Sequence, residues 1–245
     1  MNVENQPWHE VFAGKRWDRP ALDPNARGDA DVSAIFHSVG FALTTWENAE
    51  CALASLFQVM SNVTAQNAYQ AVLRAFGSIE SSAGRRRALE AAAEIYFGQY
   101  WSDPVVRKPF KDLMSAFEKA SARRDDFAHG MAYSVIVDND DKGAFLFPSN
   151  YNTGRTHAWM TAGIDPFAFI KAKYRYTSAE ILWYADGFGK LWQAVGQYIE
   201  DVRIINGMPA SVIEARFGAG AVEKLSVIIT EEQIFGKSNP EMSND

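Results

Sequence analysis

The sequence predicts a mainly α-helical fold: a helical bundle of about five helices with a small inserted antiparallel β-hairpin or three-stranded sheet. Two observations carry this prediction. Apolar residues recur at three- and four-residue steps over several long segments, which is the period of amphipathic helices. Before the last of these segments the pattern changes to short runs of β-branched and aromatic residues around a polar turn, which is typical of a hairpin.

The composition is that of a folded chain with one sizeable core. Of 245 residues, 47% are hydrophobic and 13% are aromatic, which is enough apolar surface for a single core with terminal additions. No secretory signal or membrane span is expected, since the N-terminus has no basic start before an apolar run and no apolar stretch reaches about 18 residues. Cys51 is the single cysteine, so an internal disulfide is impossible and a cytoplasmic location is expected.

The charge argues against broad, salt-driven nucleic-acid binding, because the net charge is −6 and the pI is about 5.3. A local basic groove is still compatible with this charge. Three basic runs are candidates for it, although a solvated helix face is the more common explanation of each. They are Arg85-Arg86-Arg87, Arg107-Lys108-Lys111 and Arg123-Arg124.

An N-terminal arm is expected over residues 1–31, where no clean period is found. Its aromatic residues are spaced for one short helix or for an arm laid on the body of the protein: Trp8, Phe12 and Trp17. A long helix follows over 32–60, with Asp31 as its N-cap. This helix is apolar most of the way round, which indicates burial on several sides or at a subunit contact.

Three further helices are expected over about 64–76, 82–101 and 104–130. The last begins with a capping aspartate and a proline, Asp103-Pro104, both suited to a helix start. We expect Gly130 to end it in the left-handed conformation that glycine adopts without steric strain.

The β insertion is predicted at about 132–176, within a helical domain that spans 32–205. Strands are expected over 132–137 and 144–147, with 173–176 as a third strand. A capping box at Thr177 to Glu180 then opens the final long helix, to about residue 205. Residues 206–245 are expected to hold short helices and a disordered tail.

One short motif points to chemistry. Residues Arg124-Asp125-Asp126-Phe127-Ala128-His129 place an arginine, a polar residue, three further positions and a histidine at a helix end. This order resembles the Arg-polar-x(3)-His signature of the HEPN-like superfamily. A Trp-x(3)-Glu pattern on the earlier long helix, Trp46 to Glu50, adds to the resemblance, which covers roughly residues 32–203. The resemblance implies a helical, usually dimeric protein of a kind that often cuts RNA without a metal.

The motif residues suit such a reaction. Histidine can take a proton from the ribose 2′-hydroxyl or give one to the leaving 5′-oxygen, because its pKa lies near neutrality. The Arg124 guanidinium can stabilise the charge that builds on the phosphate oxygens. The attacking 2′-hydroxyl belongs to the substrate, so the reaction needs no metal and no cofactor and gives a 2′,3′-cyclic phosphate. A structural interpretation competes, since a histidine at a helix C-terminus is stabilised by the helix dipole alone.

Helix geometry limits how these residues can meet. Five positions along a helix turn a side chain by about 140°, so Arg124 and His129 do not share one face. They converge if the arginine bends back, if the helix end loosens, or if a second protomer completes the site, as the resemblance implies. Asp125 does share a face with His129 and could orient its imidazole. Glu50 either holds Arg124 or His129 from an apolar helix face, or lies at an edge and points to water.

The predicted function is therefore a metal-independent endoribonuclease of HEPN type, with Arg124, His129, Asp125 and Glu50 as candidate catalytic residues. The resemblance implies a toxin–antitoxin or antiviral defence role. The partners expected are a second copy of the chain, single-stranded RNA and an inhibitory protein, and no membrane. The alternative is a non-catalytic HEPN-like module that forms a dimeric interaction surface or binds RNA.

Overall fold

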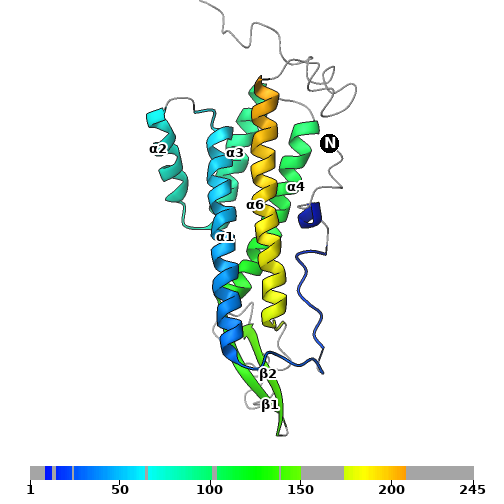
Figure 1. The fold of residues 1–245 in the computed structure, drawn as a ribbon. Coiled ribbons are helices and arrows are strands. Elements are labelled where there is room, and N and C mark those ends of the chain that lie inside the picture. The colour runs from blue at the N-terminus through cyan, green and yellow to red at the C-terminus, as the bar shows by residue number, and fades with distance from the viewer. Residues whose placement is uncertain are drawn as a thin grey trace, which may run out of the picture. The chain divides into compact units, whose positions relative to one another are not determined.

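The computed structural model describes residues 9–12, 15–23, 25–63, 66–100, 104–137, 139–149 and 174–207. In these ranges the chain is mainly helical with one two-stranded antiparallel sheet, which confirms the predicted fold class (Figure 1). The α-helices are α1 (Val32–Met60), α2 (Gln66–Gly77), α3 (Ser82–Tyr100), α4 (Pro104–Ala128) and α6 (Ser178–Gly207). The remaining elements are a 3-10 helix, η2 (His9–Phe12), and the strands β1 (Gly130–Val137) and β2 (Asp140–Pro148). No helix in the described ranges is both long and apolar enough to cross a membrane.

The chain divides into two compact units. The unit that holds the motif comprises Glu4–Ala52 and Leu113–Val195, and the other comprises Met1–Val3, Leu53–Asp112 and Gly196–Asp245. The predicted short helices and tail of the C-terminal region lie, beyond Gly207, outside the described residues.

Local capping explains where the first and last helices begin. The backbone N–H of Ser33 donates to Oδ1 of Asp31 at 2.6 Å, so Asp31 caps α1 as predicted. At α6, the N–H of Thr177 donates to Oε2 of Glu180 at 2.7 Å, and the N–H of Glu180 donates to Oγ1 of Thr177 at 3.3 Å. This reciprocal pair is the predicted capping box. The expected cap of α4, Asp103, lies outside the described residues.

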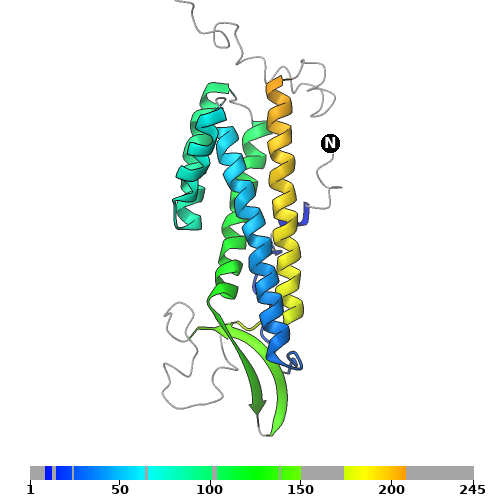
Figure 2. The same cartoon turned by 60° about the vertical axis from the view of Figure 1, so that its left-hand side comes forward.

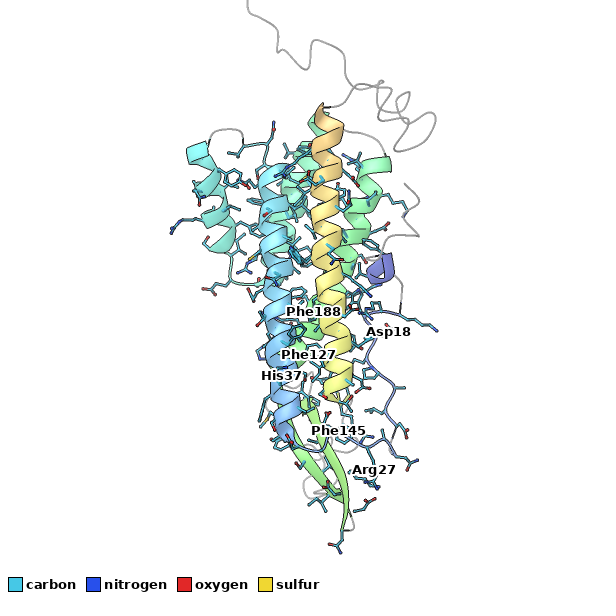
Figure 3. The ribbon with its side chains drawn as sticks, in the orientation of Figure 1. Asp18, Arg27, His37, Phe127, Phe145 and Phe188 are labelled. Atoms are coloured by element: carbon cyan, nitrogen blue, oxygen red, sulfur yellow. The ribbon has the colours of Figure 1, made fainter. Side chains whose placement is uncertain are left out.

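Aromatic rings form the core of the motif-bearing unit, between its parts of α1, α4 and α6. The Trp46 ring centroid lies 5.4 Å from that of Phe117 and 5.3 Å from that of Phe188. Phe127, in the last turn of α4, lies 6.3 Å from Phe188 between the helices (Figure 3). In both views, α1 and α6 lie side by side, and the hairpin continues from the end of α4 (Figure 1, Figure 2). These contacts fix the helix that carries the motif against its two neighbours.

The hairpin is longer than the sequence predicts. Its register pairs Gly130 with Pro148 and Val137 with Asp140, so β1 begins two residues earlier than predicted and β2 begins within the segment expected to be a turn. Asn139 takes a positive φ of 64° and Gly143 a φ of 85°, values that asparagine and glycine tolerate best. The predicted location of the hairpin and the end of β1 at Val137 are therefore right, and both strands begin earlier than predicted.

A full third strand is not found among the described residues. Tyr176 makes one isolated bridge to Leu146 of β2, with N–H to carbonyl distances of 2.8 and 3.0 Å. Lys173, the expected start of that strand, lies outside the described residues. The same edge of the hairpin receives Asp29 from the N-terminal region, which exchanges backbone hydrogen bonds of 2.9 and 2.7 Å with Ala144. Two short segments far apart in sequence thus pair with β2 where one strand was predicted.

Gly130 does not play the predicted role. Its φ is not positive, and it is the first residue of β1 rather than a left-handed helix stop. A Cβ at Gly130 would lie 2.6 Å from Cγ of Leu146 and 2.9 Å from the carbonyl oxygen of Asp126. Glycine is needed here because a strand starts directly against a buried leucine, with no room for a side chain.

The N-terminal region belongs to the motif-bearing unit and lies against its helices. Trp17 is 3% exposed, stacks on Phe188 at 5.7 Å, and donates its indole N–H to the carbonyl of Val11. Further on, Oδ2 of Asp29 accepts the N–H of Ser178 at 2.7 Å, at the start of α6. The described part of this region contains both predicted features, one short helix, η2, and a segment that lies on the helices.

The second unit is built around its own aromatic contacts. The Phe57 and Phe76 rings stack at 4.7 Å, and the Phe97 and Phe110 rings meet edge to face at 5.5 Å. The hydroxyl of Tyr198 donates to a carbonyl of α4 at 3.2 Å. None of the candidate site residues belongs to this unit.

Candidate functional site

The last two turns of α4 have a buried side and an outer side. Three side chains are buried: Arg123, Asp126 and Phe127. On the outer side, Arg124 and Asp125 are half-buried and His129 is exposed. This division follows from 3.6 residues per turn, because Arg123 lies three residues before Asp126 and four before Phe127, so the three side chains gather on one side of the helix. The three motif residues predicted to act in catalysis therefore lie on the side that solvent reaches.

Arg124 and Asp125 form an ion pair on this outer side. Nη1 of Arg124 lies 3.0 Å from Oδ1 of Asp125, and the two side chains are 29% and 37% exposed. The backbone N–H of His129 donates to the carbonyl of Asp125 at 3.2 Å, which places the imidazole one turn beyond the ion pair. The structure thus brings Arg124 and Asp125 together and holds His129 nearby in solvent. That Asp125 orients the imidazole stays a prediction.

Glu50 is buried, with 5% of its surface exposed. This excludes the interpretation in which Glu50 lies at an edge and points to water. It lies on α1 in the same compact unit as the motif. Among the described contacts, the ion-pair partner of Arg124 is Asp125 rather than Glu50. A catalytic role for Glu50 stays a prediction.

The strongest charged contacts of this region centre on Asp126, which sequence reasoning passed over. Oδ2 of Asp126 accepts Nε–H of Arg19 at 3.0 Å, and Oδ1 accepts Nη2–H of Arg19 at 2.9 Å, a two-pronged bond. The hydroxyl of Tyr176 donates to Oδ2 at 2.9 Å, and Nη1 of Arg123 lies 3.3 Å from the same oxygen. We name these four residues, Arg19, Arg123, Asp126 and Tyr176, the Asp126 cluster. It joins α4 to the N-terminal region and to the segment before α6.

Hydrogen bonding raises the pKa of one member of the cluster, Arg19, and burial raises that of another, Tyr176. The hydrogen bond to Asp126 raises the pKa of Arg19, and its guanidinium lies over the ring of Tyr174 at 4.2 Å. Burial, followed by the nearby charge of Asp126, raises the pKa of Tyr176, so the phenol remains a hydrogen-bond donor. Burial also raises the pKa of Tyr184 to about 12. The cluster therefore joins one carboxylate to two guanidiniums and to a phenol that donates its hydrogen bond.

No local signal in the sequence marked Asp126. Phe127 was assigned to the apolar face of its helix, and the residue just before it is turned away from it by about 100°. An aspartate there must find a partner if it is buried. The arginine that satisfies it, Arg19, comes from 107 residues away, and no local pattern could identify it.

A second set of arginine contacts holds the same N-terminal region to α6. Nη2 of Arg16 donates to Oδ2 of Asp186 at 2.9 Å and to the carbonyl of Trp183 at 2.7 Å. Its guanidinium lies 3.7 Å from the centre of the Trp183 ring. Arg16 and Arg19 are thus neighbouring arginines with different targets, α6 for the first and α4 for the second.

Of the three basic runs considered for a local basic groove, the structure argues most clearly against Arg123-Arg124. Arg123 is 8% exposed and bonds to Asp126, so the Arg123-Arg124 run does not form a basic surface. In the second run, Lys108 pairs with Asp112 at 2.6 Å. In the described ranges, no three His, Cys, Asp or Glu side chains are grouped so that they could hold a metal ion.

Comparison with family models, curated proteins and solved structures finds no match to this chain.

Proposed function

We propose that this protein is a metal-independent endoribonuclease of the HEPN type, with Arg124 and His129 as its catalytic residues. The observation that supports the proposal most is their placement on the outer side of the end of α4, where an RNA strand can reach both. The mainly helical fold, with a hairpin directly after the motif, agrees with the resemblance. The proposed setting is the cytoplasm, in a toxin or antiviral defence role with an inhibitory partner protein.

The proposed chemistry is an internal transesterification. His129 takes the proton of a ribose 2′-hydroxyl, and the 2′-oxygen forms a bond to phosphorus while the bond to the 5′-oxygen breaks. The leaving 5′-oxygen receives a proton from a second acid, which we assign to the histidine of a second protomer. Arg124 stabilises the charge on the phosphate oxygens. Its fork has five donors, so one nitrogen can remain on Asp125 while others bind phosphate.

The competing proposal is a non-catalytic module that dimerises or binds RNA. It is favoured by the ion pair itself, because Asp125 neutralises Arg124 in the described structure. The two proposals agree on the outer side of α4 as the functional surface and differ only in whether RNA is cut.

Cleavage of single-stranded RNA in EDTA tests the proposal. Wild-type protein at low salt should give 2′,3′-cyclic phosphate ends and leave DNA of the same sequence uncut. Arg124→Ala and His129→Ala should each lower the rate by roughly 10²-fold or more. Matched controls are His37→Ala, an exposed histidine on α1, and Arg74→Ala, an exposed arginine on α2, which should keep full activity.

Two results would decide against catalysis at this motif. Cleavage that survives both motif substitutions belongs to another site or protein. Wild-type protein that binds RNA and leaves a diverse pool of strands intact supports the non-catalytic module.

A further inference from the structure

The motif helix has an inward-facing residue between its proposed catalytic residues. Asp126 is fully buried, whereas Arg124, Asp125 and His129 lie on the outer side of the same two turns. Its carboxylate binds Arg19 from the N-terminal region, Tyr176 from the segment before α6, and Arg123 from its own helix. Three separate parts of the chain therefore meet on one side chain, within the last turn of α4.

We propose that Asp126 and Arg19 are positioning residues: their two-pronged bond fixes the rotation of the last turns of α4, and so sets where Arg124 and His129 stand. This inference rests on the proposed function. It assigns no contact with RNA to either residue.

The end of a helix needs such a fixing contact. The last four carbonyls of a helix have no partner within it, and helix ends fray as a result. In α4, strand β1 begins two residues after the helix ends, so no loop absorbs a change in its rotation. A rotation of these turns would move Arg124 and His129 together, and a displacement of about 1 Å at reacting groups can lower a rate by about 10²-fold.

The contacts favour positioning over an electrostatic role. The Asp126 charge is met by two guanidiniums and a phenol, so little of its field is left to act on the outer side. The bond to Arg19 is directional, because a planar guanidinium that binds both oxygens of a carboxylate fixes its plane as well as its distance. Direction is what a rotational constraint requires.

Arg16 provides a matched control. It belongs to the same N-terminal region, is 5% exposed, and bonds to Asp186 on α6 instead of to α4. Arg16→Gln and Arg19→Gln therefore each remove one ion pair that holds the N-terminal region to a helix. Only Arg19→Gln removes a contact with the motif helix.

The experiment measures the full-length variants in two ways. Amide hydrogen exchange at residues 124–130, followed by mass spectrometry, should be about tenfold faster in Arg19→Gln and near wild type in Arg16→Gln. Steady-state RNA cleavage should show kcat lowered about tenfold or more in Arg19→Gln with KM unchanged, since the substrate-contacting groups remain. Arg19→Lys keeps the charge without the fork and should recover only part of kcat.

The two readouts separate the inference from the function it rests on. Unchanged exchange at 124–130 in Arg19→Gln overturns the inference, and so does an equal effect of both variants, which would mean general loosening. A KM that rises while kcat holds would place Arg19 in RNA binding and also overturn it. Wild-type protein that cuts no RNA overturns the proposed function, and the exchange result then decides whether Arg19 fixes the helix end.

Discussion

Two adjacent aspartates at the end of α4 have opposite surroundings. The Asp125 side chain is 37% exposed and pairs with Arg124 at the surface, while that of Asp126 is 1% exposed and is held by Arg19, Arg123 and Tyr176. An exposed ion pair gains little, because water screens the charges and two long side chains lose freedom. A buried carboxylate is different, since its removal leaves its cationic partners without compensation.

Asp126→Ala should therefore destabilise the protein by about 3–5 kcal/mol, as loss of one partner from a buried ion pair does. Asp125→Ala should change the free energy of unfolding by less than about 1 kcal/mol. Urea unfolding followed by circular dichroism measures both. The loss of stability in Asp126→Asn should fall between those of the two alanine variants, because the amide oxygen still accepts the hydrogen bond of the Tyr176 hydroxyl. Equal losses for the two alanine variants would contradict the burial of Asp126.

For single residues, the sequence predicted the position of a side chain along a helix better than the partners that the side chain contacts. That Arg124 and His129 lie near a helix end followed from local spacing, and the structure places them there. That Asp126 is the charged centre of the region depends on Arg19, whose approach is set by the path of the whole N-terminal region. Such long-range contacts leave no trace in local periodicity.

Elements were predictable where local signals were complete. Asp31 and the Thr177 to Glu180 box fixed two helix starts, because capping is decided within four residues. The strand ends and the role of Gly130 were not, since both depend on what lies across the hairpin. From the sequence alone, Gly130 is typical of a helix stop. In the structure, its backbone lies directly against Leu146.

For this reason, two glycine-to-alanine substitutions should change the stability of the protein in opposite directions. Gly130→Ala should destabilise by about 1–3 kcal/mol, because its Cβ would meet Leu146 and the Asp126 carbonyl at less than 3.0 Å. Gly40→Ala, inside α1 with nothing within 4 Å, should stabilise by about 0.5–1 kcal/mol through reduced chain entropy in the unfolded state. Thermal unfolding of the two variants beside wild type measures the difference. A neutral or stabilising Gly130→Ala would show that β1 begins with more room than described.

On the scale of the whole molecule, α1 presents apolar side chains to solvent beside a well-packed core. Phe36 and Phe41 are 62% and 53% exposed, on the helix that was predicted to be apolar most of the way round. Together with the outer side of α4, this surface is the proposed contact with a second copy. A two-fold contact is self-complementary, so one substitution changes both halves of it.

Light scattering at micromolar concentration should give a mass of about twice 27.3 kDa. Phe41→Asp should give a monomer, because two like charges would be buried across the two-fold axis. Ile95→Asp is the matched control, a side chain 63% exposed on α3, and should leave the mass unchanged. A wild-type monomer would contradict both the dimer and a site completed by a second protomer.

The bond between Asp29 and Ser178 has a consequence for how the chain is made. The two residues are 149 positions apart, so at a synthesis rate of about 5–20 residues per second Asp29 waits roughly 7–30 s for its partner to emerge. Arg16 waits longer still, since Asp186 lies 170 positions further on. Arg16 and Asp29 are therefore synthesised early and are among the last residues to reach their final contacts. In a nascent chain, a protease should cleave after Arg16 and Arg19 until α6 has been synthesised. Loss of this cleavage therefore reports that the fold is complete.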